Sequence, residues 1–237
     1  MKKLFILSIF FSLICLSCND DPEPGPEVIR AYCNLYHFIP ELGSVIWDVD
    51  EVEVPDEKIY AMQFAGSIIL ESESEGIAFT VKHSGTKEVL ASEIFQLEKD
   101  KYYNVIASGS KEDPTLFIRE IDTSHPQAGN VKFQLLHSTP DQNSIDLYMG
   151  GTTPEKRIVS DLDYLVLTDP FEALDSDARS AITVSKHSEE YHQDSVLLSS
   201  IYNEDIISGA SYLSVVANFT FDPSSELTFW LYLMPLE

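Results

Sequence analysis

The chain has 237 residues, of which 44% are hydrophobic, 13 are phenylalanine and 11 are tyrosine, so it carries enough apolar material for a buried core. Its formal net charge is −24, because 39 acidic residues outnumber 15 basic ones. Binding to nucleic acid relies on clustered Lys and Arg side chains. The sequence contains no such cluster, so we expect no nucleic-acid partner.

Two lysines and an apolar run open the chain, and this run, residues 4–16, is shorter than the ~20 residues that a membrane-spanning helix requires. Ser17 and Cys18 then close the run, and this arrangement resembles a lipobox. In proteins so marked the cysteine receives a diacylglycerol and the chain is cleaved just before it. We predict a lipoprotein signal peptide over residues 1–17 and a lipid anchor on Cys18, the alternative being an ordinary secretory signal with a chance cysteine.

An acidic, proline-rich stretch, residues 18–27, follows the predicted cleavage point. Its start, Asn19-Asp20-Asp21, resembles the acidic export signal of Bacteroidota lipoproteins that reach the outer face of the outer membrane. The composition also fits a solvated, extended spacer, and the two interpretations are compatible. We expect an outer-membrane, lipid-anchored protein displayed at the cell surface.

The cysteine count predicts a mature chain without a disulfide. Cys15 leaves with the signal peptide, Cys18 carries lipid, and Cys33 alone remains. Cys33 lies in a β-rich run, where we expect a small buried thiol rather than a nucleophile.

Short β-branched and aromatic runs alternate with turn residues beyond residue 27, which is an all-β pattern. Residues 171–179 give the one helical turn that we expect. The predicted strands are Ser44–Asp48, Ile77–Lys82, Tyr102–Ala107, Leu116–Ile121, Val131–His137, Ile145–Met149, Tyr164–Thr168, Ala181–Ser185, Tyr212–Phe219 and Leu227–Leu233.

A weak internal repeat organises these strands, with an offset near one hundred residues. Ala78-Phe79-Thr80-Val81 recurs as Ala181-Ile182-Thr183-Val184, and the run that begins at Tyr102 recurs at Tyr212. We predict two tandem immunoglobulin-like β-sandwich domains, with Tyr102 and Tyr212 at matching positions. The predicted boundaries are residues 28–122 for domain 1, 123–130 for the linker and 131–237 for domain 2.

Residues 131–141 and 144–151 resemble the opening of the domain-of-unknown-function family 4397, in which a small-Pro-Asp turn leads to an Asp-x-Tyr strand and a glycine turn. Residues 97–109 resemble its closing strand, whereas Ile39-Pro40-Glu41 departs from the turn. The resemblance implies architecture and cell-surface placement, and no chemistry.

Clusters of metal-ligand residue types are sparse. His187, Glu189, Glu190 and His192 stand close in sequence, but a metal needs three or four converging ligands, so we expect a solvated loop. Asp161 and Asp163 alternate on a predicted strand and are the candidate carboxylates for calcium, without the form of a calcium loop. Alternating carboxylates also occur at Asp48, Asp50, Glu51 and Glu53. We expect neither a metal nor a cofactor.

Nucleophile, P-loop and dinucleotide motifs are absent from the sequence, so we expect a protein that is not an enzyme. Asp194-Ser195-Val196 resembles the acceptor motif for O-glycosylation in exported Bacteroidota proteins, which makes Ser195 a candidate glycosylation site.

Tyrosine and tryptophan rings keep a binding role open, because they suit stacking on sugars or contact with proteins. We expect most of them, Trp47 and Trp230 included, to lie in the core. The sequence therefore predicts a surface module that binds glycan or protein. The alternatives are a glycan-acting hydrolase and a structural stalk or assembly subunit. The rings considered for binding are Tyr36, Trp47, Tyr148, Tyr191 and Tyr202.

Overall fold

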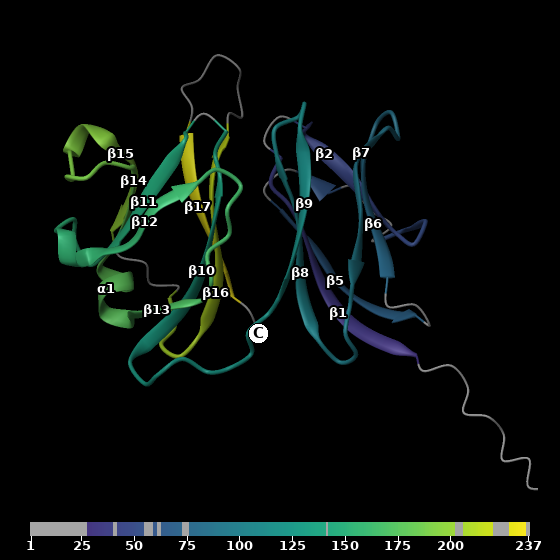
Figure 1. Ribbon diagram of the computed structural model, residues 1–237, viewed down its shortest axis with the longest axis horizontal. Helices are drawn as coiled ribbons and strands as arrows, with labels where there is room; N and C mark the ends of the chain where they lie inside the picture. Colours follow the sequence, from purple (N-terminus) through teal and green to yellow (C-terminus); the bar gives the residue numbers. More distant parts are fainter. Residues whose placement is uncertain are drawn as a thin grey trace, which may run out of the picture.

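The computed structural model describes residues 28–235 except 40–41, 55–58, 61–62, 73–75, 141, 202–205 and 220–227. The described chain is mostly β-strand, in four small sheets that form two β-sandwich units (Figure 1). The predicted signal peptide, Cys18 and the spacer lie outside the described residues. No helix in the described ranges is long and apolar enough to cross a membrane.

The first unit consists of two sheets that face each other. Sheet A has the strand order β5-β1-β8-β9, and sheet B has the order β3-β2-β6-β7 with β4 paired to β2. The strands are β1 (Ile29–His37), β2 (Ser44–Val49), β3 (Val52–Glu53), β4 (Ile59–Tyr60), β5 (Gln63–Ser72), β6 (Gly76–His83), β7 (Val89–Gln96), β8 (Tyr102–Gly109) and β9 (Pro114–Glu120).

The second unit repeats this plan. Sheet C has the order β13-β10-β16-β17, and sheet D has the order β12-β11-β14-β15. Its elements are β10 (Asn130–Ser138), β11 (Ser144–Met149), β12 (Arg157–Asp163), β13 (Phe171–Leu174), the short helix α1 (Asp175–Ser180), β14 (Ala181–Lys186), β15 (Val196–Ile201), β16 (Ser211–Phe219) and β17 (Thr228–Pro235).

The two units share one topology, in which the first strand of each pairs in parallel with its second-to-last strand. β1 runs parallel to β8, and β10 runs parallel to β16. In the neighbouring sheets Val81 pairs with Trp47, and Val184 pairs with Leu147. These partners place the Ala78–Val81 and Ala181–Val184 segments at matching positions, as the repeat predicts.

The immunoglobulin-like strand order that we expected is not shown. In an immunoglobulin constant domain the first two strands belong to the same sheet. Here β1 lies in sheet A and β2 in sheet B, and the second unit separates β10 and β11 in the same way. The internal repeat predicted a pair of sheets in each unit, but it did not predict which strands belong to the same sheet.

The predicted match of Tyr102 with Tyr212 is wrong by one residue. Cys33 pairs with Tyr103, and the corresponding Phe133 pairs with Tyr212. Tyr103 and Tyr212 are buried in the two cores, whereas Tyr102 is 43% exposed. Because side chains alternate between the two faces of a strand, a slip of one residue exchanges the inner face for the outer.

Two other local predictions need correction. Residues 164–168 are not a strand, because only an isolated bridge between Leu136 and Leu167 forms there. Residues 171–179 are not one helical turn, because β13 occupies Phe171–Leu174 and α1 begins only at Asp175.

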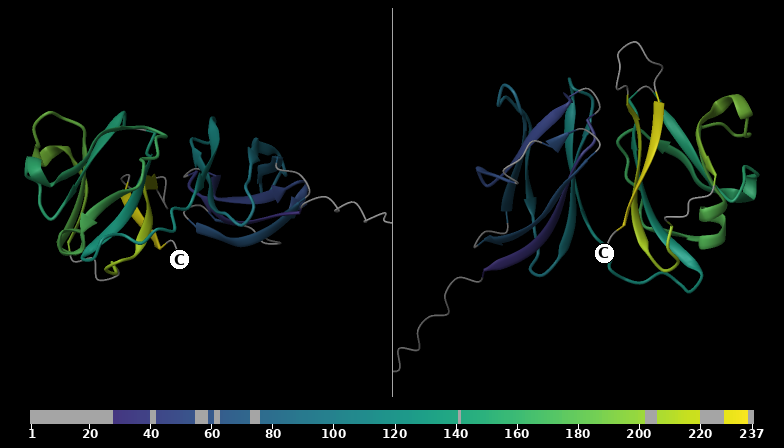
Figure 2. Two further views of the ribbon diagram at one scale, coloured as in Figure 1. Left: turned by 60° about the horizontal axis from the view of Figure 1, so that its bottom comes forward. Right: turned by 180° about the vertical axis from the view of Figure 1, so that it is seen from behind.

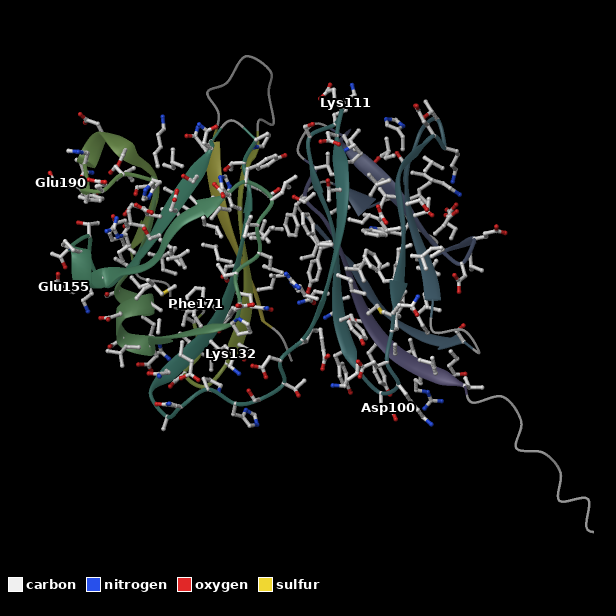
Figure 3. The ribbon with its side chains drawn as sticks, in the orientation of Figure 1. Asp100, Lys111, Lys132, Glu155, Phe171 and Glu190 are labelled. Atoms are coloured by element: carbon white, nitrogen blue, oxygen red, sulfur yellow. The ribbon has the colours of Figure 1, made fainter. Side chains whose placement is uncertain are left out.

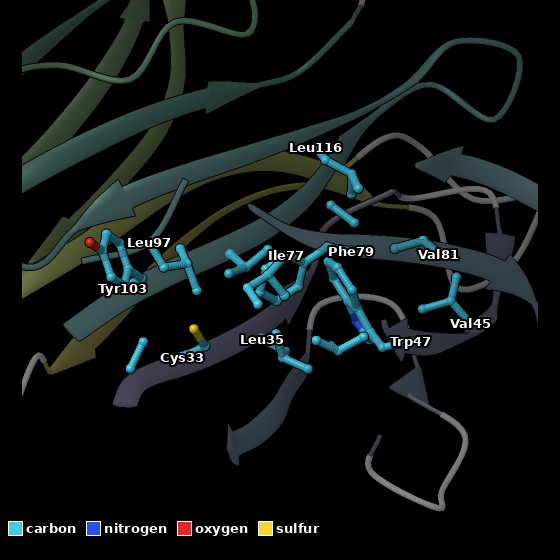
Figure 4. Close-up of a cluster of buried hydrophobic side chains, with 14 of the residues drawn as sticks. Cys33, Leu35, Val45, Trp47, Ile77, Phe79, Val81, Leu97, Tyr103 and Leu116 are labelled. Carbon is cyan, nitrogen blue, oxygen red and sulfur yellow. The ribbon is translucent and has the colours of Figure 1, made fainter. Parts of the chain in front are cut away.

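The four sheets lie in the order B, A, C, D along the long axis of the molecule (Figures 1 and 2). Each neighbouring pair of sheets encloses a cluster of apolar side chains. Trp47, Phe79 and Cys33 belong to the cluster between sheets B and A (Figure 4). Phe133, Leu147 and Val184 belong to the cluster between sheets C and D. Each unit therefore has a core of its own.

A third cluster, which we call the interunit core, joins the units through the outer faces of sheets A and C. Its buried members are Tyr36, Phe38, Ile106, Leu136, Leu167, Leu213, Val215 and Ala217. The side-chain hydroxyls of Ser108 and Ser138 form a hydrogen bond across the same interface. The two units thus pack against each other directly.

The segment between β9 and β10 is also fixed. The Nζ atom of Lys132 lies 2.7 Å from Asp122 Oδ2, and it donates to the carbonyl oxygen of Ser124 at 2.7 Å. These contacts hold the pKa of the Asp122 carboxyl at about 2, below its ordinary value, mainly through the hydrogen bond from Lys132. The segment is therefore held against sheet C at its start.

Candidate functional site

A polar network lies on the outer face of sheet D, and the Asp146 carboxylate is at its centre. Strand β11 alternates, so that Ile145, Leu147 and Met149 enter the core while Asp146 points to the other face. The Asp146 side chain is nonetheless fully buried. A buried carboxylate needs partners to offset its lost hydration, and neighbouring strands and a loop supply them.

Three groups surround the Asp146 carboxylate. Its Oδ1 atom accepts a hydrogen bond from the backbone N–H of Asp161 at 2.8 Å and lies 2.8 Å from Nδ1 of His187. Its Oδ2 atom lies 3.5 Å from Nη1 of Arg157. Strand β12 supplies Arg157 and Asp161, whereas His187 directly follows β14. The central position of β11 between β12 and β14 brings these residues together.

His187 lies between two carboxylates. Its Nδ1 atom contacts Asp146, and its Nε2 atom lies 3.8 Å from Oδ1 of Asp161. The hydrogen bond with Asp146 is the main cause that raises the pKa of His187 above its ordinary value. Asp161 itself has a left-handed backbone (φ 55°) and accepts a hydrogen bond from the Ser144 hydroxyl at 2.7 Å. The arrangement favours the protonated imidazole.

Residues 187–195, which we call the capping loop, contact this face at further points. Arg157 Nη1 donates to the carbonyl oxygen of Ser188 at 3.0 Å. The Tyr191 ring meets Tyr148 edge-on, with centroids 5.4 Å apart and an interplanar angle of 72°. Tyr148 is buried, and burial is the main cause that raises the pKa of its phenol. Tyr191 stays half-buried at the surface of the network.

The corresponding position in the first unit carries no charge. Ile46 pairs with Lys82 in β6, and Asp146 pairs with Ser185 in β14, so Ile46 and Asp146 occupy the same position in the two units. Ile46 is buried and apolar. Strand β2 carries its own buried carboxylate two residues further on, at Asp48, which pairs with Lys82. The second unit therefore places its buried carboxylate, and the loop that contacts it, where the first unit has an apolar side chain.

The network brings together two residues that belong to separate candidate groups in the sequence, Asp161 and His187. It does not unite Asp161 with Asp163 around a cation site, and among the described residues no three His, Cys, Asp or Glu side chains are placed to hold a metal ion. Charged groups, hydroxyls and the Tyr191 ring share this face. Such a face can form hydrogen bonds and stack on a ring.

The other candidate residues lie apart from the network. Cys33 is fully buried, and burial raises the pKa of its thiol to about 12. Trp47 lies in the core of the first unit, and Tyr36 belongs to the interunit core. Asp48 forms an ion pair with Lys82.

The remaining candidates from the sequence are Ser195, Tyr202 and Trp230. Ser195 lies in a short 3-10 helix of the capping loop and donates to the carbonyl oxygen of His192 at 2.6 Å. Tyr202 lies outside the described residues, and only the backbone of Trp230 is described. Figure 3 places Glu190 and Glu155 at the end of the molecule opposite the first unit.

Sequence reasoning missed Asp146 and Arg157. A signal for Asp146 was present, because a lone carboxylate interrupts the apolar positions of the predicted strand at residues 145–149. Arg157 gave no such signal, since its position depends on the pairing of β12 with β11.

Comparison with known proteins gives a family model and distant similarity to solved structures. Residues 31–148, just under half of the chain, match the family model described as a domain of unknown function (DUF4397). This range runs from β1 into β11. The match is to the family noted in the sequence and includes residues 97–109, but it begins at residue 31 and ends within the stretch 144–151. A crystal structure from Bacteroides uniformis ATCC 8492, described as a "putative cell adhesion protein", is 8% identical, with 86% of this chain and 98% of that chain covered and a TM-score of 0.20. No curated protein matches.

Proposed function

We propose that this chain is a non-enzymatic lipoprotein of the bacterial outer membrane, anchored through lipid on Cys18, which binds glycan or protein at the cell surface. The observation that carries the binding role is the polar network around Asp146. Its central carboxylate has three partners, including His187 of the capping loop, at a position where the first unit has the apolar Ile46.

The order of the four sheets supports this role. The described chain begins at the first unit, next to β1, whereas sheet D lies at the opposite end of the molecule (Figure 1). A lipid anchor that precedes β1 would leave the outer face of sheet D pointing away from the anchored end. The interunit core would hold that orientation, because it joins the two units into one stack.

A glycan-acting hydrolase is the alternative from another class. The pair of Asp146 and His187 has the hydrogen bond that orients a general base. However, a glycosidase uses two carboxyl groups that flank the scissile bond. Of the two carboxylates in this network only Asp161 is exposed, because Asp146 is fully buried. The geometry therefore favours binding over catalysis. A structural stalk would need no polar network at this end.

Modification of Ser195 is a second part of the proposal. We propose O-glycosylation there, since the Asp194-Ser195-Val196 motif lies in the half-exposed capping loop. Intact-mass measurement of the exported protein tests it. A Ser195→Ala variant should lose the mass of one glycan, and a difference of only the serine oxygen atom between the two proteins would refute the assignment.

A binding screen combined with an activity screen tests the main proposal. The chain from Pro22 onward keeps every described residue and lacks the predicted anchor, so it suits glycan and protein arrays. We expect saturable binding to a glycan or a protein and no turnover of any bound glycan. Catalytic release of sugar, or the absence of any ligand in both arrays, would contradict the proposal.

A further inference from the structure

Building on the proposed binding function, we propose that the outer face of sheet D binds a neutral sugar ring, with Tyr191, Arg157 and Asp161 as its contact residues. Asp146 and His187 act as positioning residues for Arg157 and Asp161, and Tyr148 packs against Tyr191. The inference names both a site and a class of ligand.

The contact residues Asp161 and Arg157 are more exposed than Asp146, which positions them. The Asp161 side chain is 62% exposed and that of Arg157 is 23% exposed, whereas Asp146 is fully buried beneath them. Asp146 binds the backbone of Asp161 and lies beside the Arg157 guanidinium. One buried carboxylate thus fixes both an outward carboxylate and an outward guanidinium. Preorganised polar groups are what a small ligand site requires, because ordering them on binding would cost affinity.

The contact residues match the surface of a pyranose. Adjacent sugar hydroxyls each donate and accept hydrogen bonds, a carboxylate accepts from two donors, and a guanidinium has several N–H groups to offer. Arg157 uses Nη1 for Asp146 and Ser188 and also forms a side-chain hydrogen bond with Tyr148, and its side chain is 23% exposed. The half-buried Tyr191 ring supplies an apolar surface beside these groups, suited to the C–H face of a sugar.

Charge selects a neutral ligand over an acidic one. Removal of Lys2 and Lys3 with the signal peptide lowers the formal net charge from −24 to −26. Within the network, Asp146 and Asp161 are balanced by Arg157 and His187, so no uncompensated cation remains to attract an anion. A sialylated or sulfated glycan would meet repulsion from the whole protein without local compensation.

Binding of the chain from Pro22 onward to immobilised oligosaccharides tests the inference. The probes are neutral glucose-, galactose-, mannose- and fucose-containing oligosaccharides, with sialylated and sulfated counterparts. We expect the neutral probes to bind. Tyr191→Ala and Asp161→Asn should each weaken that binding by about tenfold or more, as expected for residues at the centre of a contact.

Tyr102→Ala is the matched control, because Tyr102 is an exposed tyrosine of the first unit that stacks on Tyr32 with centroids 4.5 Å apart. Its affinity should equal that of the unchanged protein. Thermal unfolding identifies a variant that fails to fold, and the exposed Asp161→Asn change then decides alone.

The outcomes separate this inference from the proposed function. Neutral binding that survives both site variants, or binding of acidic glycans or proteins only, would overturn the sugar site and leave the binding function standing. Absence of any ligand would remove both.

Discussion

Tyr103 and Tyr212 make the same hydrogen bond in the two units. The hydroxyl of Tyr103 accepts from the backbone N–H of Glu98 at 3.0 Å, and that of Tyr212 accepts from the backbone N–H of Ile207 at 2.8 Å. In both cases the donor lies five residues upstream, where the chain enters the strand. Each tyrosine therefore fixes the corner before the strand that pairs in parallel with the first strand of its unit.

Removal of either hydroxyl should destabilise its unit. Tyr103→Phe and Tyr212→Phe should each lower the free energy of unfolding by about 1 kcal/mol, because a partly buried N–H group loses its acceptor. Urea unfolding measures the change. Tyr102→Phe is the control, and its stability should stay within about 0.5 kcal/mol of the original. An equal effect of all three changes would contradict the assignment.

The same two tyrosines show what the sequence could and could not predict. Composition and alternation predicted a β protein with a repeat, and Val81 and Val184 occupy the expected matching positions. The repeat aligned Tyr102 with Tyr212 because Val105 and Ala107 then fall opposite Val215 and Ala217. The pairing with the first strand of each unit matches Tyr103 with Tyr212 instead. Asp161 and His187 stand 26 positions apart, and only the pairing of β11 with both β12 and β14 joins them.

The interunit core changes the expected result of cutting the linker. After a protease site is inserted following Pro126 and cut, we expect the two fragments to elute together on size exclusion. Their apolar outer faces would otherwise be exposed to water. Leu213→Asp should separate them, since it places a charge in that core. Ile94→Asp, at a 67% exposed apolar position, should not. Separation of the unmutated fragments would contradict the packing.

Two buried histidines predict loss of stability in acid. Burial lowers the pKa of His37 to about 3 and that of His137 to about 4. Both values lie below the unfolded value of about 6.5, so their full stability is present above that pH. It is lost as the pH falls toward the folded values, by about 2 kcal/mol for each residue at pH 5. Urea unfolding at pH 7.5 and pH 5 measures the loss, which His137→Gln should reduce by about half.

The carboxylate of Asp146 should control both the charge and the order of its surroundings. In Asp146→Asn we expect the pKa of His187 to fall toward its ordinary value, as measured by NMR titration. In the original protein the stability due to His187 is present below its unfolded pKa and lost as the pH rises through its raised pKa. We also expect a loss of about 2 kcal/mol in unfolding free energy and faster hydrogen exchange in residues 188–193.

Asp163→Asn provides the control for that change, because Asp163 is exposed on the same strand, β12. It should leave both the His187 titration and the exchange of the capping loop unchanged. If Asp146→Asn also leaves them unchanged, the carboxylate does not support the site.

Lipid anchoring through Cys18 is the claim on which the proposed function depends most. Metabolic labelling with a fatty acid, followed by detergent partitioning of cells that carry the native chain or Cys18→Ala, tests it in one measurement. We predict a lipid-labelled mature band for the native chain, and only unlabelled precursor or soluble protein for Cys18→Ala. A mature, lipid-labelled Cys18→Ala protein in the detergent phase would contradict the anchor.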